Sequence, residues 1–211
     1  MRCKYKLLQG TLIKRYKRFF VNISYKNKTL IAHCPNSGSM LGLLDDGNKV
    51  WFSKSDNPKR KLKYTLEMIE VKKRLVGVNT LMTNKIVHEA LNENKIKDLK
   101  RFNIIKPEVK FSDKTRFDFM LTNDTNKSFL EVKNVTLLRN KNVGEFPDSV
   151  TSRGTKHLNE LVLSIKKGFE SFILYLIQME GCNSFKIASD IDPIYKKAFN
   201  NAKKSGVKIL C

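Results

Sequence analysis

The chain has 211 residues, 41% of them hydrophobic, which is enough to bury one sizeable core or two modest ones. No apolar run approaches the roughly 18 residues that span a bilayer, and neither end resembles a secretory signal, so we expect a cytoplasmic protein without a membrane partner. The 41 Lys and Arg residues against 20 Asp and Glu give a formal net charge of +21, which favours a polyanionic partner.

Five strand-like runs follow one another in residues 1–77, namely KLLQGTLIKRY, RFFVNISY, KTLIAHC, KVWFSKS and YTLEMIEVKK. Turn and loop compositions such as KNK, PNSGS and DNPKRK separate them. Five strands without a helix predict an OB-like five-stranded β-barrel, a fold that presents basic grooves to nucleic acid. The region holds 18 basic and 5 acidic residues, whereas residues 78–211 hold 23 and 15. A Lys- and Asn-rich proteome is the alternative explanation for the charge.

The basic residues of this first domain are the candidates for phosphate contact, and they form two groups. They are Lys14, Arg15, Lys17 and Arg18, and then Lys59, Arg60 and Lys61. Such contacts would position nucleic acid without reading its sequence. The aromatic residues Tyr16, Phe19, Phe20 and Trp51 could stack on bases or could belong to the core of the barrel.

From residue 78 onward, helical and strand-like patterns alternate. The spacing predicts a helix over 80–94, strands in EVKFS, RFDFMLT and SFLEVKNVTLL, and a second helix over 155–168. The strand ESFILYLIQM, the helix DPIYKKAFNNAKKSG and the run VKILC follow. This order, αβββαβ and then αβ, predicts a second domain over 78–211 and an α/β fold class, α+β overall.

Charged residues interrupt two of these predicted strands. In SFLEVKNV, Glu131 and Lys133 are two residues apart and project from one face of the strand. If RFDFM pairs with this run as a hairpin, Asp118 joins the same face. A divalent cation such as Mg²⁺ or Mn²⁺ would compensate two carboxylates, and Lys133 could then hold or help to deprotonate an attacking water. A structural salt bridge between Lys133 and one of the acids is the simpler alternative.

This arrangement resembles the active site of the PD-(D/E)XK nuclease superfamily, which combines an Asp on one strand with Glu-x-Lys on the next. The resemblance implies catalytic roles for Asp118, Glu131 and Lys133, with Asp118 and Glu131 as metal ligands. It also implies a further ligand from the first helix, and Glu89 is at a suitable place. Phe117 stands where the motif has Pro, which is a commonly variable position.

Longer motifs make the resemblance more specific. LIKRYKRFFVNI, HCPNSGSM, VWFSKSDNPKRK, EVKNVTL and FPDSVTSRGTKHLNELV occur in an order that is similar to the sugar fermentation stimulation protein A (SfsA) family, from about residue 10 to residue 210. The resemblance implies an N-terminal OB-like domain, a C-terminal PD-(D/E)XK-like domain, DNA binding and a link to the regulation of sugar utilisation, especially of maltose.

Two of these motifs have both structural and functional interpretations. HCPNSG has the Pro, Asn and Gly of a forced turn. In FPDSVTSRGTKHL, Arg153 and Lys156 could contact phosphate where a helix begins, and His157 could do the same or could form a structural hydrogen bond.

The sequence leaves three functions open: a metal-dependent DNA nuclease, a DNA-binding regulator that keeps the nuclease fold without turnover, and an RNA-binding or RNA-processing factor. DNA is the preferred partner over RNA. The four cysteines form no zinc or disulfide pattern, so we expect reduced thiols. The sequence leaves the oligomeric state open.

Overall fold

The structure is a computed structural model that describes residues 6–113, 115–140 and 142–211. The chain divides into two compact units. The first consists of Met1–Leu81, Val135–Asp148 and Ile177–Lys186, and the second of Met82–Asn134, Ser149–Leu176 and Ile187–Cys211. The boundary that we predict at residues 77 and 78 therefore lies close to the first crossing, and the chain crosses between the units again at later points.

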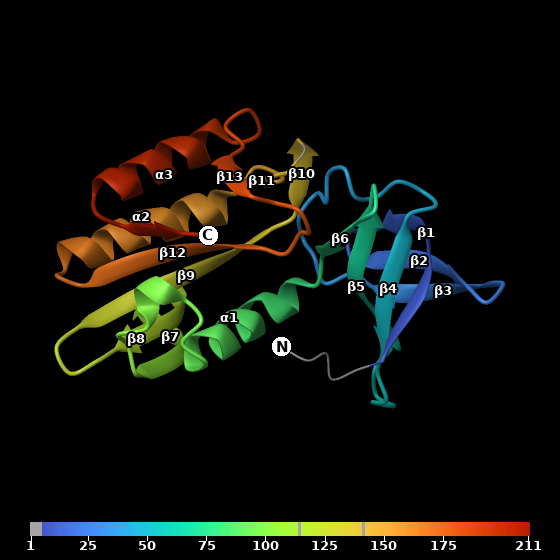
Figure 1. Cartoon of the computed structure of the whole chain (residues 1–211), viewed down its shortest axis with the longest axis horizontal. Coiled ribbons are helices and arrows are strands. Elements are labelled where there is room, and N and C mark those ends of the chain that lie inside the picture. Colours follow the sequence, from blue (N-terminus) through green and yellow to red (C-terminus); the bar gives the residue numbers. More distant parts are fainter. Residues whose placement is uncertain (1–5, 114, 141) are drawn as a thin grey trace. The chain divides into compact units, whose positions relative to one another are not determined.

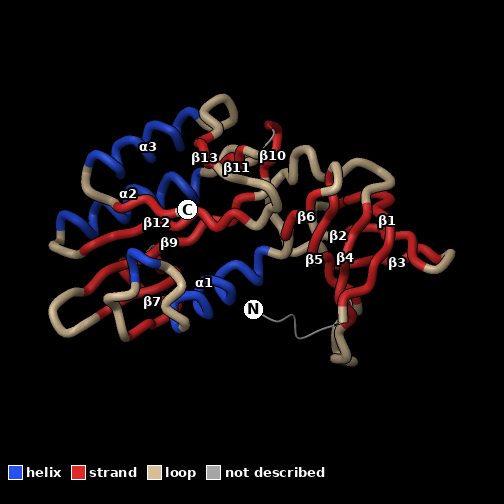
Figure 2. Tube along the Cα trace, viewed as in Figure 1, coloured by secondary structure: helices blue, strands red, loops and turns tan. Residues whose placement is uncertain are grey.

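The first unit contains a six-stranded sheet in the order β3-β2-β1-β4-β5-β6. Its strands are β1 (Leu7–Tyr16), β2 (Phe20–Tyr25), β3 (Lys28–His33), β4 (Lys49–Lys54), β5 (Tyr64–Val71) and β6 (Arg74–Gly77). The sheet curls until β3 also pairs in parallel with β5, with Ala32 opposite Tyr64 and His33 opposite Thr65. Figure 2 shows these elements as strands and loops.

Five of the six strands match the runs that we predict, and β6 is additional. Its four residues follow the two-residue turn Lys72-Lys73, and both turn residues have positive φ, as a tight hairpin requires. Alternation explains the core of the sheet, because Val21, Ile23 and Ala32 point inward and are fully buried.

A second, three-stranded sheet in the order β10-β11-β13 joins three short strands from distant parts of the chain. They are β10 (Leu137–Asn140), β11 (Val143–Phe146) and β13 (Ser184–Ile187). Glu145 of β11 is fully buried. Its carboxylate accepts two hydrogen bonds of 2.9 Å from Arg139 of β10. The predicted strand SFLEVKNVTLL extends into the first two residues of β10, whereas the structure interrupts it at Thr136. β11 and β13 are not predicted, because each is only four residues long.

The second unit is built on a five-stranded sheet in the order β14-β12-β9-β8-β7. The strands are β7 (Ile104–Ser112), β8 (Thr115–Thr122), β9 (Lys127–Val135), β12 (Glu170–Ile177) and β14 (Lys208–Leu210). The helices are α1 (Thr83–Asn92), α2 (Ser152–Lys166) and α3 (Pro193–Lys204), with the short 3-10 turns η1 (Thr80–Met82) and η2 (Lys97–Leu99). The predicted order of elements is therefore present.

The helices of the second unit cover both faces of its sheet. Figure 1 shows α2 and α3 side by side over one face and α1 over the other. Val87 and Leu91 of α1 pack in a buried cluster with strand residues that include Phe119 and Leu130. The start of α2 is fixed by the Thr151 side chain, which accepts a hydrogen bond of 3.0 Å from the Gly154 N–H.

No helix of the described residues is both long and apolar enough to cross a membrane. Cys34, Cys182 and Cys211 are free thiols, as expected, and Cys3 lies outside the described residues.

Candidate active site

The predicted hairpin exists, and it brings the site residues of neighbouring strands together. β8 and β9 pair antiparallel, with Phe119 opposite Leu130 as the last register pair. The next residues beyond that pair are Asp118 and Glu131. Phe119 and Leu130 are buried in the cluster with α1. Asp118 and Glu131 are therefore adjacent in sequence to core residues of the second unit.

Asp118 is a mostly buried carboxylate with a donor on each oxygen. Its Oδ1 accepts a hydrogen bond of 2.7 Å from Asn84 Nδ2 of α1, and its Oδ2 accepts one of 2.7 Å from the Val132 N–H. Burial and then the negative charge of Glu131 raise the pKa of Asp118 to about 6, although these hydrogen bonds and Lys133 oppose the shift. Burial and the charge of Glu131 therefore outweigh the positive charge of Lys133 at Asp118.

Glu131 is more deeply buried but is compensated. Lys133 Nζ lies 2.5 Å from Glu131 Oε1, with only 12% and 3% of the two side chains exposed, and His157 Nδ1 of α2 contacts the same oxygen. Burial alone would raise the pKa of Glu131, but the charge of Lys133 and the hydrogen bonds from His157 and Lys133 outweigh burial and hold this pKa below its usual value.

The hydrogen-bond partners of His157 assign its tautomer. Glu131 Oε1 can only accept, so Nδ1 of His157 carries the proton that it donates. Nε2 is then the acceptor that faces Arg153 Nε at 3.5 Å. Lys133 Nζ, 3.4 Å from Nδ1, is a neighbour of the ring and has no acceptor there. His157 thus belongs to the site as a positioning residue for Glu131, a role outside the predicted catalytic set.

The oxygens of the two carboxylates fit a divalent cation in part. Within residues 6–113, 115–140 and 142–211, Glu131 Oε2 is a buried oxygen with no hydrogen-bond partner. The same residues contain no cluster of three or more His, Cys, Asp and Glu side chains that could hold a metal ion by itself. An ion of the Mg²⁺ type needs only one or two carboxylates, because water and substrate phosphate complete its coordination. Asp118 and Glu131 satisfy that smaller requirement.

The contact from the first helix to Asp118 comes from Asn84 rather than from an acid. Glu89 lies further along α1 and is one of the acids, after Glu93, that raise the pKa of Lys95. The role of Glu89 as a metal ligand stays a prediction. The sequence does not predict Asn84 as a site residue, because an amide at a helix start resembles an ordinary capping residue.

Arg15, predicted to contact phosphate, is occupied by its own chain. Its guanidinium donates to the carbonyl oxygens of Asn36 at 2.7 Å, Gly38 at 2.9 Å and Ser39 at 3.2 Å, and its Nε donates to that of Arg18 at 2.7 Å. The structural interpretation of the HCPNSG motif is therefore supported, because Arg15 clamps this loop.

The same loop is held by Asp148. The Met40 N–H donates a hydrogen bond of 2.9 Å to Asp148 Oδ2, and Ser39 Oγ donates one of 2.5 Å to the Asp148 carbonyl oxygen. A Cβ at Gly38 would overlap the Asp148 carboxylate, so a larger residue there would force this side chain to shift.

We expect Arg15→Lys to destabilise the protein by about 1–3 kcal/mol, because one ammonium cannot replace a planar fork with several donors and carbonyl oxygens lose their partners. Urea unfolding measures this change. Lys14→Ala is the matched control: Lys14 is exposed on the same strand, and its loss should cost less than about 0.5 kcal/mol. Equal effects for the two variants would contradict the clamp.

The remaining predicted phosphate-binding residues are mostly at the surface. Lys14, Lys17, Arg18, Lys59 and Lys61 are exposed in the first unit, and Arg153 and Lys156 are exposed in the second. Arg60 is half-buried and donates a hydrogen bond of 3.0 Å to Thr65 Oγ1.

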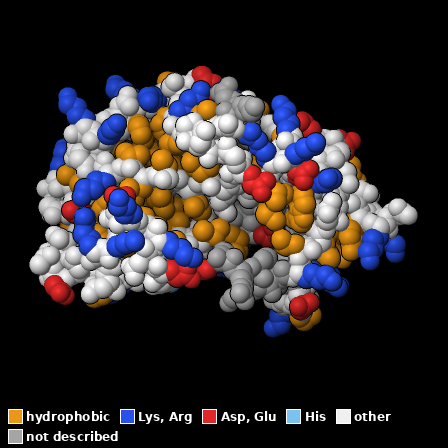
Figure 3. Space-filling view, in the orientation of Figure 1, with side chains coloured by type: hydrophobic (Ala, Val, Ile, Leu, Met, Phe, Trp, Pro, Cys, Tyr) orange, Lys and Arg blue, Asp and Glu red, His pale blue; other side chains and the backbone are white. Residues whose placement is uncertain are grey.

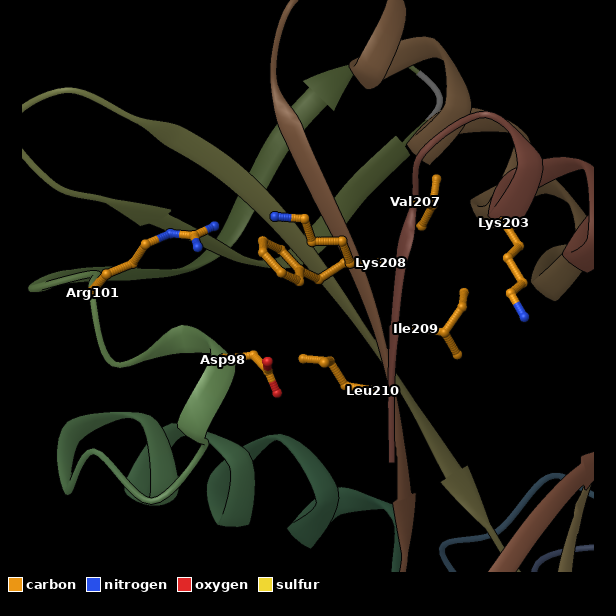
Figure 4. Close-up of a pocket in the computed structure, with 8 residues that line it drawn as sticks. Asp98, Arg101, Lys203, Val207, Lys208, Ile209 and Leu210 are labelled. Carbon is orange, nitrogen blue, oxygen red and sulfur yellow. The ribbon is translucent and has the colours of Figure 1, made fainter.

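A cavity of about 530 Å³ lies elsewhere in the second unit, beside β14. Figure 4 shows Arg101, Lys203 and Lys208 around it, together with Asp98. Glu170 forms ion pairs with both Arg101 and Lys208, so part of this positive charge is balanced. Figure 3 shows hydrophobic side chains gathered on one face of this unit, with Lys and Arg around them. The cavity contains none of the predicted site residues.

Two family models match the chain. One is described as the SfsA N-terminal OB domain and matches residues 13–78. The other is described as the sugar fermentation stimulation protein RE domain and matches residues 81–211. The matches cover the two regions that differ in sequence pattern.

Curated relatives are similar over nearly the whole chain. A sugar fermentation stimulation protein homolog from Pelagibacter ubique is 54% identical over 204 residues, which is 97% of this chain and 88% of the relative. A homolog from Caulobacter vibrioides is 42% identical over 206 residues, 97% of this chain and 86% of the relative.

A solved structure has the same fold. Pyrococcus furiosus SfsA in complex with Ca²⁺ superposes with a TM-score of 0.90 at 22% sequence identity, covering 99% of this chain and 88% of that one.

Proposed function

The chain belongs to the sugar fermentation stimulation protein (SfsA) family, and from this premise we propose that it binds nucleic acid, DNA before RNA, and hydrolyses phosphodiester bonds with a divalent cation held by Asp118 and Glu131. The observation that carries the proposal is the pairing of the buried carboxylate of Glu131 with the half-buried carboxylate of Asp118, whose pKa is raised to about 6 by desolvation and by Glu131. Perturbed acids of this kind are concentrated at functional sites.

Three further observations support a cation at this place. Glu131 Oε2 is buried and lacks a partner within the described part of the chain. The negative charges of Asp118 and Glu131 disfavour each other, and a cation would relieve this repulsion. The Pyrococcus furiosus protein of the same fold is in complex with Ca²⁺. Mg²⁺ or Mn²⁺ is our proposal for turnover.

The side chains around the carboxylates have separate tasks in this proposal. Asn84 and the Val132 N–H fix the carboxylate of Asp118, and His157 holds Oε1 of Glu131 so that Oε2 stays available. Lys133 donates a hydrogen bond to the attacking water and places positive charge beside the phosphate. The cation, when bound, supplies Lewis-acid stabilisation of the charge that develops on the phosphate.

A cleavage assay tests the proposal. Labelled single- and double-stranded DNA and RNA are incubated with the protein in Mn²⁺, Mg²⁺ or EDTA. We expect cleavage only with the cation, and a loss of at least about 100-fold in Asp118→Ala and Lys133→Ala, because each removes several kcal/mol of transition-state stabilisation. Glu170→Gln, an acid on the same sheet that pairs with Arg101 and Lys208, should cleave normally.

The non-catalytic regulator is the second candidate, favoured by the Lys133–Glu131 ion pair, which accounts for both charges without a substrate. Binding without cleavage under every cation would support the regulator and overturn the nuclease. In either case, affinity should fall steeply as salt rises, because Lys and Arg contacts release counterions from phosphates.

A further inference from the structure

The outer face of the first sheet carries a row of aromatic side chains in register across three strands. Tyr16 of β1 lies opposite Phe20 of β2, and Phe20 lies opposite His33 of β3. Residues that face each other in antiparallel strands project from the same side. All three side chains are half-buried, whereas their neighbours Val21 and Ala32 point into the core.

The rings in this row are close to one another. Tyr16 and Phe20 are stacked, with centroids 5.5 Å apart and 23° between their planes. Phe19, in the turn between β1 and β2, is 42% exposed, and its ring centroid lies 6.5 Å from that of His33. A large apolar ring at this exposure, next to other partly exposed rings, provides flat surface for a planar ligand.

Positive charge flanks the row at both ends. Lys17 and Arg18 occupy the β1–β2 turn and are exposed. At the other end, His33 lies opposite Thr65 of β5, and Thr65 accepts the hydrogen bond from Arg60. Burial and then the charge of Arg60 lower the pKa of His33. The β3–β5 pairing thus unites two basic clusters that are about forty residues apart in sequence.

We infer that the aromatic row Tyr16, Phe19, Phe20 and His33 is a stacking platform for single-stranded nucleic acid, with the exposed residues Lys17 and Arg18 at one end and Lys59 and Lys61 at the other as its phosphate contacts. Rings at successive positions match successive unpaired bases, whereas the bases of a duplex are stacked on each other and cannot reach a flat surface. This inference rests on the nucleic-acid binding that we propose above, and it specifies the form of the ligand.

Fluorescence anisotropy in EDTA tests the platform without cleavage. We expect Phe19→Leu to weaken binding of single-stranded oligothymidine about fivefold or more, because one base loses its stacking partner. Phe19→Trp should keep the affinity, and duplex binding should change less than about twofold in both variants. A single-stranded RNA arm reports whether the platform distinguishes the two sugars. Because Phe19 is exposed, melting temperatures should stay equal.

The charged residues have a matched control at the other end of the same hairpin strands. Lys17→Ala with Arg18→Ala should reduce the salt slope of single-strand binding by about 0.7 for each lost phosphate contact. Lys26→Ala with Lys28→Ala removes the same charge at the β2–β3 turn, away from the row, and should leave this slope closer to that of the wild type.

Two outcomes would overturn the inference: wild-type affinity for single strands in Phe19→Leu, or an equal loss for duplex and single strand. Neither outcome affects the nuclease proposal, which depends on cation-dependent cleavage. Conversely, absent cleavage with normal stacking behaviour would overturn only the nuclease.

Discussion

Asp118→Asn should fold more stably than the wild type near neutral pH while losing cation-dependent cleavage. The folded protein holds the Asp118 proton more tightly than the unfolded chain, because burial and Glu131 raise its pKa from 3.8 to about 6. Wild-type stability from this group is therefore present at low pH, falls as pH rises from about 4 to 6, and is lost above about 6. At 1.36 kcal/mol per pKa unit, the ionised carboxylate costs up to about 3 kcal/mol.

The amide has no charge to bury, so the difference between variant and wild type should grow with pH. We expect Asp118→Asn to be about 1–3 kcal/mol more stable near pH 7.5 and equal to the wild type near pH 4. One amide oxygen still accepts from the Val132 N–H, and Asn84 can turn its own amide to face the new donor. Urea unfolding in EDTA across this pH range measures the difference.

Asp192→Asn is the control. Asp192 is also buried and accepts backbone hydrogen bonds of 2.8 Å from Thr151 and Tyr195, where it caps α3. Asn has a single acceptor oxygen, so Asp192→Asn leaves one of these two N–H groups without its partner and should lower stability, which is the opposite sign. Mn²⁺ should raise the melting temperature of the wild type and leave that of Asp118→Asn unchanged, since a cation that binds only the folded state stabilises it. If Asp118→Asn were less stable than the wild type at every pH, the ionised Asp118 carboxylate would not be costing the folded protein stability.

The sequence is informative wherever one periodicity runs over several turns or residues. The stripe of Leu158, Leu161 and Val162 predicts a helix, and α2 is present, although it begins three residues before the predicted start because Thr151 caps it. The alternation in SFLEVKNV likewise predicts the strand that carries Glu131 and Lys133.

Local sequence patterns do not predict short elements or long-range contacts. β10, β11 and β13 have only four residues each, and a period of two cannot be read from so few positions. Arg15 lies in a basic cluster that is typical of phosphate binding, yet its guanidinium donates to four carbonyl oxygens from residues 18–39. Asn84 and His157 reach the site only because α1 and α2 pack against the same pair of strands.

Exposed and buried charged residues have different energetic requirements. Exposed lysines cost little and can serve any polyanion, whereas a buried charge must have a partner in the fold or in a ligand. Glu131 has Lys133 and His157 on one oxygen, and Asp118 has only uncharged donors. The site therefore carries one compensated carboxylate and one that is only partly compensated, an arrangement that is unfavourable for stability and suited to a cation.

Lys133→Met should destabilise the protein by about 3 kcal/mol, because it leaves Glu131 buried with His157 as its remaining partner. Adding Glu131→Gln should recover much of this loss, since the double variant removes both charges of this pair, and the coupling from a double-mutant cycle should exceed about 1.5 kcal/mol. Lys110→Met is the control: Lys110 lies 2.7 Å from Asp113, but 64% and 93% of these side chains are exposed. Its loss should cost less than about 0.5 kcal/mol. If Lys133→Met were equally mild, the ion pair would contribute nothing to the fold, and Lys133 would be kept for chemistry alone.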